Sequence, residues 1–164
     1  MKTKLEQSIA EIAKDRKTVI EKLVQFSLTD MLLFWGTNKD LAQRQEKLWS
    51  PILIWAKENL DTKFNITKSI NVPEQDSESS IKLKMFLETL NDKELTCFYY
   101  AALNMRSILL AAALIKRKIN AQQAFEASCL EELWQAEQWG QDEAAENRRK
   151  SLLEELKTIE SFIK

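Results

Sequence analysis

Carboxylates crowd one short stretch of the sequence, FEASCLEELWQAEQWGQDEAAE at residues 125–146. The members that could form an acid/base pair or a metal cage are Glu131, Glu132, Glu137, Asp142 and Glu143. Dinuclear carboxylate sites on helices normally add a Glu-x-x-His pair, and the chain contains no histidine. Two interpretations are therefore left open: a solvated acidic helix face, and an acidic docking patch for a partner protein.

The remaining residue types offer no catalytic constellation. Without histidine there is no common general base and no Ser-His or Cys-His pair. Cys97 and Cys129 stand alone without C-x-x-C spacing, which predicts buried free thiols in a reducing compartment. Gly36 and Gly140 are isolated, so no glycine-rich loop can cradle a phosphate. We predict a protein that is not an enzyme and uses no cofactor or metal.

Four tryptophans lie at positions where either burial or contact with a partner is possible: Trp49, Trp55, Trp134 and Trp139. Tryptophan side chains are more often buried than exposed, but exposed tryptophans are enriched at the centre of protein interfaces. Trp139 precedes Gly140 at an expected helix end, where partial exposure is plausible. Arg44 and Gln45 are expected to project polar groups, either into a structural salt bridge or towards a partner.

Charge and hydropathy exclude several other classes. The 24 basic and 25 acidic residues give a net charge of −1, so no field favours nucleic acid or an anionic membrane. The apolar run from Ile108 to Ile115 is too short to span a bilayer. The N-terminal residues alternate in charge and lack an apolar signal core. We expect a bacterial cytoplasmic protein, or a mitochondrial matrix protein if the chain is a mature or truncated eukaryotic form, and the oligomeric state is not readable.

Two glycines and two prolines are all that interrupt the 164 residues, which favours an all-α fold. We predict a single domain over residues 1–164, built as a compact bundle of about six helices around a central apolar helix at about 92–117. Asp30 is expected to cap a short turn at 31–35, and Asn120 to cap a helix. The other expected helices cover 4–25, 40–49, 51–60, 80–90, 121–140 and 142–163.

The stretch between the expected helices at 51–60 and 80–90 differs in composition. Residues 64–72 are rich in β-branched side chains and predict a short extended segment. Residues 73–80, PEQDSESS, are polar and predict a mobile loop.

Three ordered blocks of the chain resemble the Atp12 family of assembly chaperones for the F1 sector of ATP synthase. The first block follows the family pattern A-x-x-x-S-x-L-E-E-x-x-Q-x-x-x-W-G-x-x-E, with matches at Ala124, Ser128, Leu130, Glu131, Glu132, Gln135, Trp139, Gly140 and Glu143. The second block comprises Thr29–Phe34 followed by Leu41, Arg44, Gln45, Trp49, Pro51, Ile52, Leu53, Trp55 and Ala56. The third is a small-residue helix with Ala102, Leu103, Ser107, Leu109 and Ala111–Leu114.

The chain departs from the family pattern at several points. Family members usually carry glycine before the serine of the third block, where this chain has Arg106. An aromatic-arginine pair expected after Leu33 is replaced by Phe34-Trp35. The resemblance covers the helical C-terminal domain of the family and does not include its N-terminal β-rich domain.

The resemblance implies a chaperone that works without ATP and binds the unassembled α subunit of F1-ATPase, preventing its aggregation. The client-binding candidates that it implies are Glu131, Glu132, Gln135, Trp139, Gly140, Glu143, Arg44 and Gln45. The alternative is a generic helical interaction or structural domain with an unrelated partner.

Overall fold

The computed structural model describes residues 2–164, which form nine α-helices and one short 3-10 helix. Their bounds are α1 Lys2–Lys14, α2 Arg16–Ser27, η1 Met31–Leu33, α3 Lys39–Asn59, α4 Ser77–Thr89, α5 Asp92–Met105, α6 Ile108–Ile115, α7 Ala121–Ser128, α8 Leu130–Trp139 and α9 Glu143–Phe162. The all-α prediction is confirmed.

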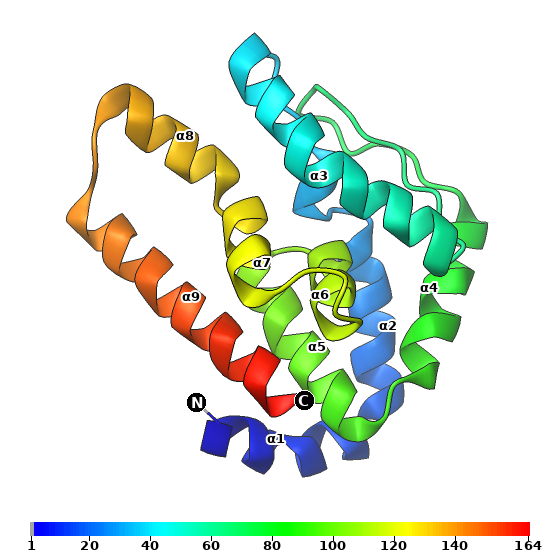
Figure 1. Cartoon of the computed structure of the whole chain (residues 1–164). Coiled ribbons are helices and arrows are strands. Elements are labelled where there is room, and N and C mark those ends of the chain that lie inside the picture. Colours follow the sequence, from blue (N-terminus) through cyan, green and yellow to red (C-terminus); the bar gives the residue numbers. More distant parts are fainter. Residues whose placement is uncertain (1) are drawn as a thin grey trace.

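The core is organised around α5 and α6, which lie in the middle of the molecule (Figure 1). Every residue of α6 is buried, as expected for a helix that is apolar on all sides. The alanines of the two helices allow close approach, with α1 packing on α5 and with α2, α3 and α7 packing on α6. The helix α9 runs along α7 and returns to the base of the molecule, near α1 (Figure 1).

The prediction of one continuous central helix at 92–117 is wrong, because the chain breaks between α5 and α6. Arg106 ends α5 in the left-handed conformation, with φ of 59°, and Ser107 then caps α6 by accepting from the amide of Leu110 at 3.0 Å. Ser107 also donates its hydroxyl to the buried carboxylate of Asp30 at 2.8 Å. These contacts come from a distant segment, so the helical pattern of the sequence did not reveal them.

Asp30 joins two helix starts inside the core. Its Oδ1 accepts from the amide of Leu32 at 2.9 Å, which caps η1 as predicted. Its Oδ2 accepts from the amide of Leu109 at 3.0 Å, in the first turn of α6. Burial raises the pKa of this carboxyl to about 6, although the hydrogen bonds from Leu109, Leu32, Ser107 and Ile108 oppose that rise.

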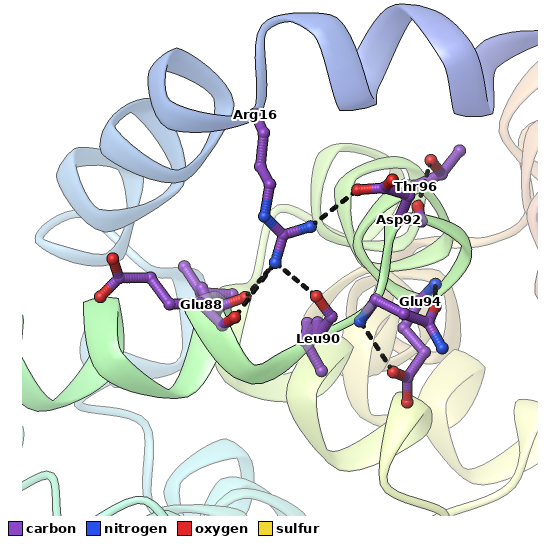
Figure 2. Close-up of polar contacts among 8 residues, drawn as sticks. Arg16, Glu88, Leu90, Asp92, Glu94 and Thr96 are labelled. Atoms are coloured by element: carbon purple, nitrogen blue, oxygen red, sulfur yellow. Dashed lines mark hydrogen bonds and ion pairs between the residues drawn. The ribbon is translucent and has the colours of Figure 1, made fainter.

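A second polar contact fixes the corner between α1 and α2 to the junction of α4 and α5 (Figure 2). Arg16 pairs with Asp92 at 3.0 Å and donates to the carbonyls of Glu88, at 3.2 Å, and of Leu90. A cationic side chain on the last carbonyls of a helix satisfies groups that the helix itself cannot. Here the guanidinium closes α4, and Asn91 and Glu94 begin α5 with a capping box.

Three other expected helices have different bounds. The helix expected at 4–25 is two helices that meet at Asp15. The helices expected at 40–49 and 51–60 are one, since α3 passes through Pro51. Proline removes the donor for the carbonyl of Lys47, and both residues are exposed, so water can satisfy that carbonyl. The helix expected at 121–140 breaks at Cys129, while Asn120 caps its start as predicted.

The connection between α3 and α4 is irregular, and its prediction is right only in part. A single parallel bridge pairs Phe34 with Thr67, where the amide of Trp35 donates to the Thr67 carbonyl at 2.8 Å. The loop predicted at 73–80 is too long, because Asp76 caps α4 and residues 77–80 form its first turn. The mobility of residues 73–76 stays a prediction.

We expect the substitution Asp30→Asn to lower the free energy of unfolding by about 1–3 kcal/mol, because one amide N–H would then face an NH₂ group. The folded pKa of Asp30 lies above the unfolded value of 3.8. Its stabilising contribution is therefore full below about pH 4 and is lost as the pH rises through about 6.

Urea unfolding of both proteins between pH 4 and 7.5 measures this effect. The difference in the free energy of unfolding between wild type and Asp30→Asn should narrow as the pH rises. A difference that widens with pH would mean that the hydrogen bonds outweigh burial, contrary to the raised pKa.

Candidate partner-binding surface

The helices α8 and α9 form an arm that leaves the body of the molecule and returns to it (Figure 1). The turn at residues 140–142 joins them, and Gly140 ends α8 with φ of 96°. This backbone conformation favours glycine, since a side chain there would be strained even though nothing lies within 4 Å of its Cβ. Gly140 therefore shapes the arm, and its value as a contact stays a prediction.

The two tryptophans of α8 have opposite environments. Trp134 is 9% exposed and donates its indole N–H to Asp40 of α3 at 3.0 Å. Trp139 is 75% exposed and packs edge-on against Trp134, with ring centroids 5.9 Å apart. An exposed tryptophan held by a buried one has little rotamer freedom to lose on binding, which suits it to anchor a partner.

The carboxylates of the arm also divide into free and paired groups. Glu131 and Glu143 are exposed, and neither forms an ion pair with any residue of the described chain, 2–164. Glu132 instead pairs with Arg148 and lies 3.6 Å from Arg149, so it holds α8 to α9. The pairing raises the pKa of the Arg148 guanidinium. Of the predicted carboxylates, Glu131 and Glu143 are thus the ones available to a partner.

Arg44 lies across the gap between α3 and α8. Its guanidinium pairs with Glu137 at 2.6 Å and with Asp40 at 3.3 Å, and Glu137 first and Asp40 second raise its pKa. The pair with Glu137 and the hydrogen bond from Trp134 to Asp40 fasten the arm to α3, whereas the pair between Arg44 and Asp40 lies within α3. The structural salt bridge expected as one alternative for Arg44 is present, and its guanidinium remains partly exposed.

Gln45 does not project towards solvent, contrary to the prediction. Its side chain is 1% exposed, and its Oε1 accepts from the amide of Gly36 at 2.9 Å. The close approach of Gly36 to Leu41, which a Cβ would contact at 2.6 Å, brings that amide within reach. Gln45 therefore fixes the entry to α3 rather than forming part of the surface.

A groove of about 420 Å³ runs between the end of α5 and the arm. It brings together Glu131, Glu132 and Gln135, which the sequence predicted, with residues that it did not: Met31, Asn104, Met105, Arg106, Ser128, Cys129, Arg148 and Leu152. Exposed Gln135 lies at its edge. The sequence marked Arg106 only as a departure from the family's glycine, because the left-handed backbone of Arg106 depends on the break between α5 and α6.

The cysteines and carboxylates of the described residues are groups that could react with a substrate or bind a metal ion. Burial raises the pKa of Cys97 to about 12 and also raises that of Cys129, so both thiols stay protonated. Among residues 2–164 no cluster of carboxylates and cysteines is arranged to hold a metal ion. No helix in the same residues is both long and apolar enough to cross a bilayer. The fold is all-helical, and this surface is the one for which the sequence predicted contact with a partner.

Comparisons with known proteins agree on one family. Residues 2–57 match the model of the ATP12 chaperone protein family. The crystal structure of Atp12 from Paracoccus denitrificans superposes with a TM-score of 0.93 at 29% identity, covering 98% of this chain and 70% of that one. The Atu1473 protein of Agrobacterium tumefaciens gives a TM-score of 0.88 at 27% identity, covering 95% of this chain and 59% of that one.

Mitochondrial Atp12 of Schizosaccharomyces pombe is 24% identical over 149 residues, which are 84% of this chain and 50% of the yeast protein. The chain thus spans about half the length of this curated relative. The chain is thus similar to the Atp12 family in sequence over residues 2–57 and in fold over almost all of its length, as the three sequence blocks predicted.

The tryptophans provide a test of which aromatic groups support the fold. Trp49 is fully buried and donates its indole N–H to the carbonyl of Ala127 at 2.9 Å. We expect Trp49→Phe to lower the free energy of unfolding by about 2–4 kcal/mol, since it leaves a cavity and an orphaned carbonyl. The same change at Trp139 should cost about 0.5 kcal/mol or less.

Urea unfolding followed by far-UV circular dichroism measures both variants without relying on the altered fluorophore. Similar losses for the two variants would show that Trp139 supports the core and is not free to contact a partner.

Proposed function

We propose that this chain is an assembly chaperone of ATP synthase that binds the unassembled α subunit of F1-ATPase and prevents its aggregation without using ATP. Similarity to the Atp12 family in sequence and fold supports the class of function. The observation that carries the proposal is Trp139, which is exposed at the end of α8, on the same arm as Glu131 and Glu143, neither of which forms an ion pair within residues 2–164. Such an arrangement suits contact with another protein.

Such a chaperone must protect its client from aggregation and must later release that client for assembly. An unassembled subunit exposes apolar surface that later meets its neighbours, and such surface favours incorrect association. Covering it lowers the concentration of the species that aggregates. The correct neighbour must then displace the chaperone, which requires moderate affinity and a partly polar interface. One tryptophan anchor with exposed carboxylates meets both conditions.

The absence of an ATP requirement has support from the glycines. The chain has two, and neither belongs to a phosphate-binding loop: Gly36 packs against Leu41, and Gly140 ends a helix. Release by competition with the next subunit needs no nucleotide.

We expect Glu131→Lys to weaken binding of the α subunit roughly tenfold, because it places a cation where the partner's surface is expected to be basic. Glu78→Lys is a matched control, since Glu78 is also an exposed carboxylate in the first turn of a helix and has no ion pair within residues 2–164. The control should bind within twofold of wild type.

Light scattering of purified α subunit, with and without the chain, measures suppression of aggregation, and titration by calorimetry gives affinity. Wild type should suppress aggregation near equimolar amounts and leave an unrelated aggregating protein unaffected. Failure of folded wild type to do so would refute the function, whereas full activity of Glu131→Lys would refute the acidic contact.

A further inference from the structure

Arg106 occupies a backbone conformation that disfavours it. Its φ of 59° places it in the left-handed region at the C-terminal cap of α5, a position where glycine is the usual residue. A residue with a Cβ is strained there, and such strain is concentrated at functional sites. The backbone conformation therefore does not explain the presence of arginine at this position, and we look to its side chain for the explanation.

The surrounding contacts prevent the backbone from relaxing. The Arg106 amide donates to the carbonyl of Ala102, and the Arg106 carbonyl accepts from the amide of Met31 at 3.2 Å. Ser107, the next residue, is held by the buried carboxylate of Asp30. The start of α6 thus requires the left-handed turn, but it does not require an arginine at position 106.

Arg106 lines the groove between α5 and the arm. The groove contains two arginines and two glutamates, of which Arg148 and Glu132 neutralise each other. Arg106 and Glu131 are exposed, and within residues 2–164 neither has an ion-pair partner. With respect to the part of the chain that the structure describes, the groove therefore presents one unpaired cation and one unpaired anion.

We propose that Arg106 contacts the client, binding a carboxylate side chain of a client segment that lies in this groove while a basic side chain of that segment faces Glu131. The inference rests on the proposed function and adds the charge pattern of the bound segment. Guanidinium binds carboxylate through two parallel hydrogen bonds, which lysine cannot reproduce. The strained arginine is kept for this contact at the expense of stability.

The chain provides a matched control in Arg117. It also has a left-handed backbone, with φ of 60°, and follows α6 in the turn that leads to α7. Its guanidinium donates to the carbonyl of Ile163 at 3.3 Å and is not part of the groove. Glycine at either position removes a similar strain, but only one of the two changes removes the proposed contact.

Four variants separate stability from binding: Arg106→Gly, Arg106→Lys, Arg106→Glu and Arg117→Gly. Both glycine variants should raise the melting temperature by roughly 2–4 °C. Arg106→Gly should weaken binding of the α subunit at least tenfold, whereas Arg117→Gly should leave it unchanged. Arg106→Lys should lose roughly threefold, and Arg106→Glu should bind most weakly of all, while both keep the wild-type melting temperature.

Wild-type affinity in Arg106→Gly or in Arg106→Glu, with wild type itself binding the client, would overturn this inference and leave the proposed function intact. Equal loss in Arg117→Gly would also overturn it, because the loss would then follow from the altered backbone. If wild type does not bind the α subunit, the proposed function fails and this inference fails with it.

Discussion

A buried carboxylate holds the centre of this fold together. Asp30 accepts hydrogen bonds from the amides of Leu32 and Leu109 and from the hydroxyl of Ser107, although burial raises its pKa to about 6. A helix that is apolar on every side can be buried in a core only if the N–H groups of its first turn find hydrogen-bond acceptors there. Asp30 satisfies one of them and orients the Ser107 cap that satisfies another, so α6 can begin where no water reaches it.

The features of the candidate partner-binding surface follow from that start. Since α6 must begin at Ser107, α5 must end one residue earlier, and Arg106 takes the left-handed turn that puts its side chain at the groove. The far wall of the groove is set by the arm, which the Arg44–Glu137 ion pair and the Trp134–Asp40 hydrogen bond fasten to α3. The core thus determines the charges that the groove presents. This links a buried acid to the contact proposed for an exposed arginine.

The sequence predicted those parts of the fold that depend on local pattern. The all-α class, the caps at Asp30 and Asn120, and the end of α8 at Gly140 follow from residue types within one or two turns. The breaks at Asp15, Arg106 and Cys129 were missed because hydrophobic periodicity continues through them. Gln45 was misplaced for a similar reason, since its partner Gly36 is brought near by tertiary packing. The motif named Glu131 and Trp139 as candidates, but only the structure distinguishes Glu131, which has no ion pair within residues 2–164, from Glu132, which pairs with Arg148.

Hydrogen exchange of the chain, alone and bound to the α subunit, tests the central claim most directly, namely that the groove and the arm form the client-binding surface. The account predicts slower exchange upon binding in the amides of α8, the 140–142 turn and the end of α5, with α4 and the 61–76 connection unchanged. Protection confined to α4 and that connection, where Ile70, Ile81 and Met85 are exposed, would contradict it.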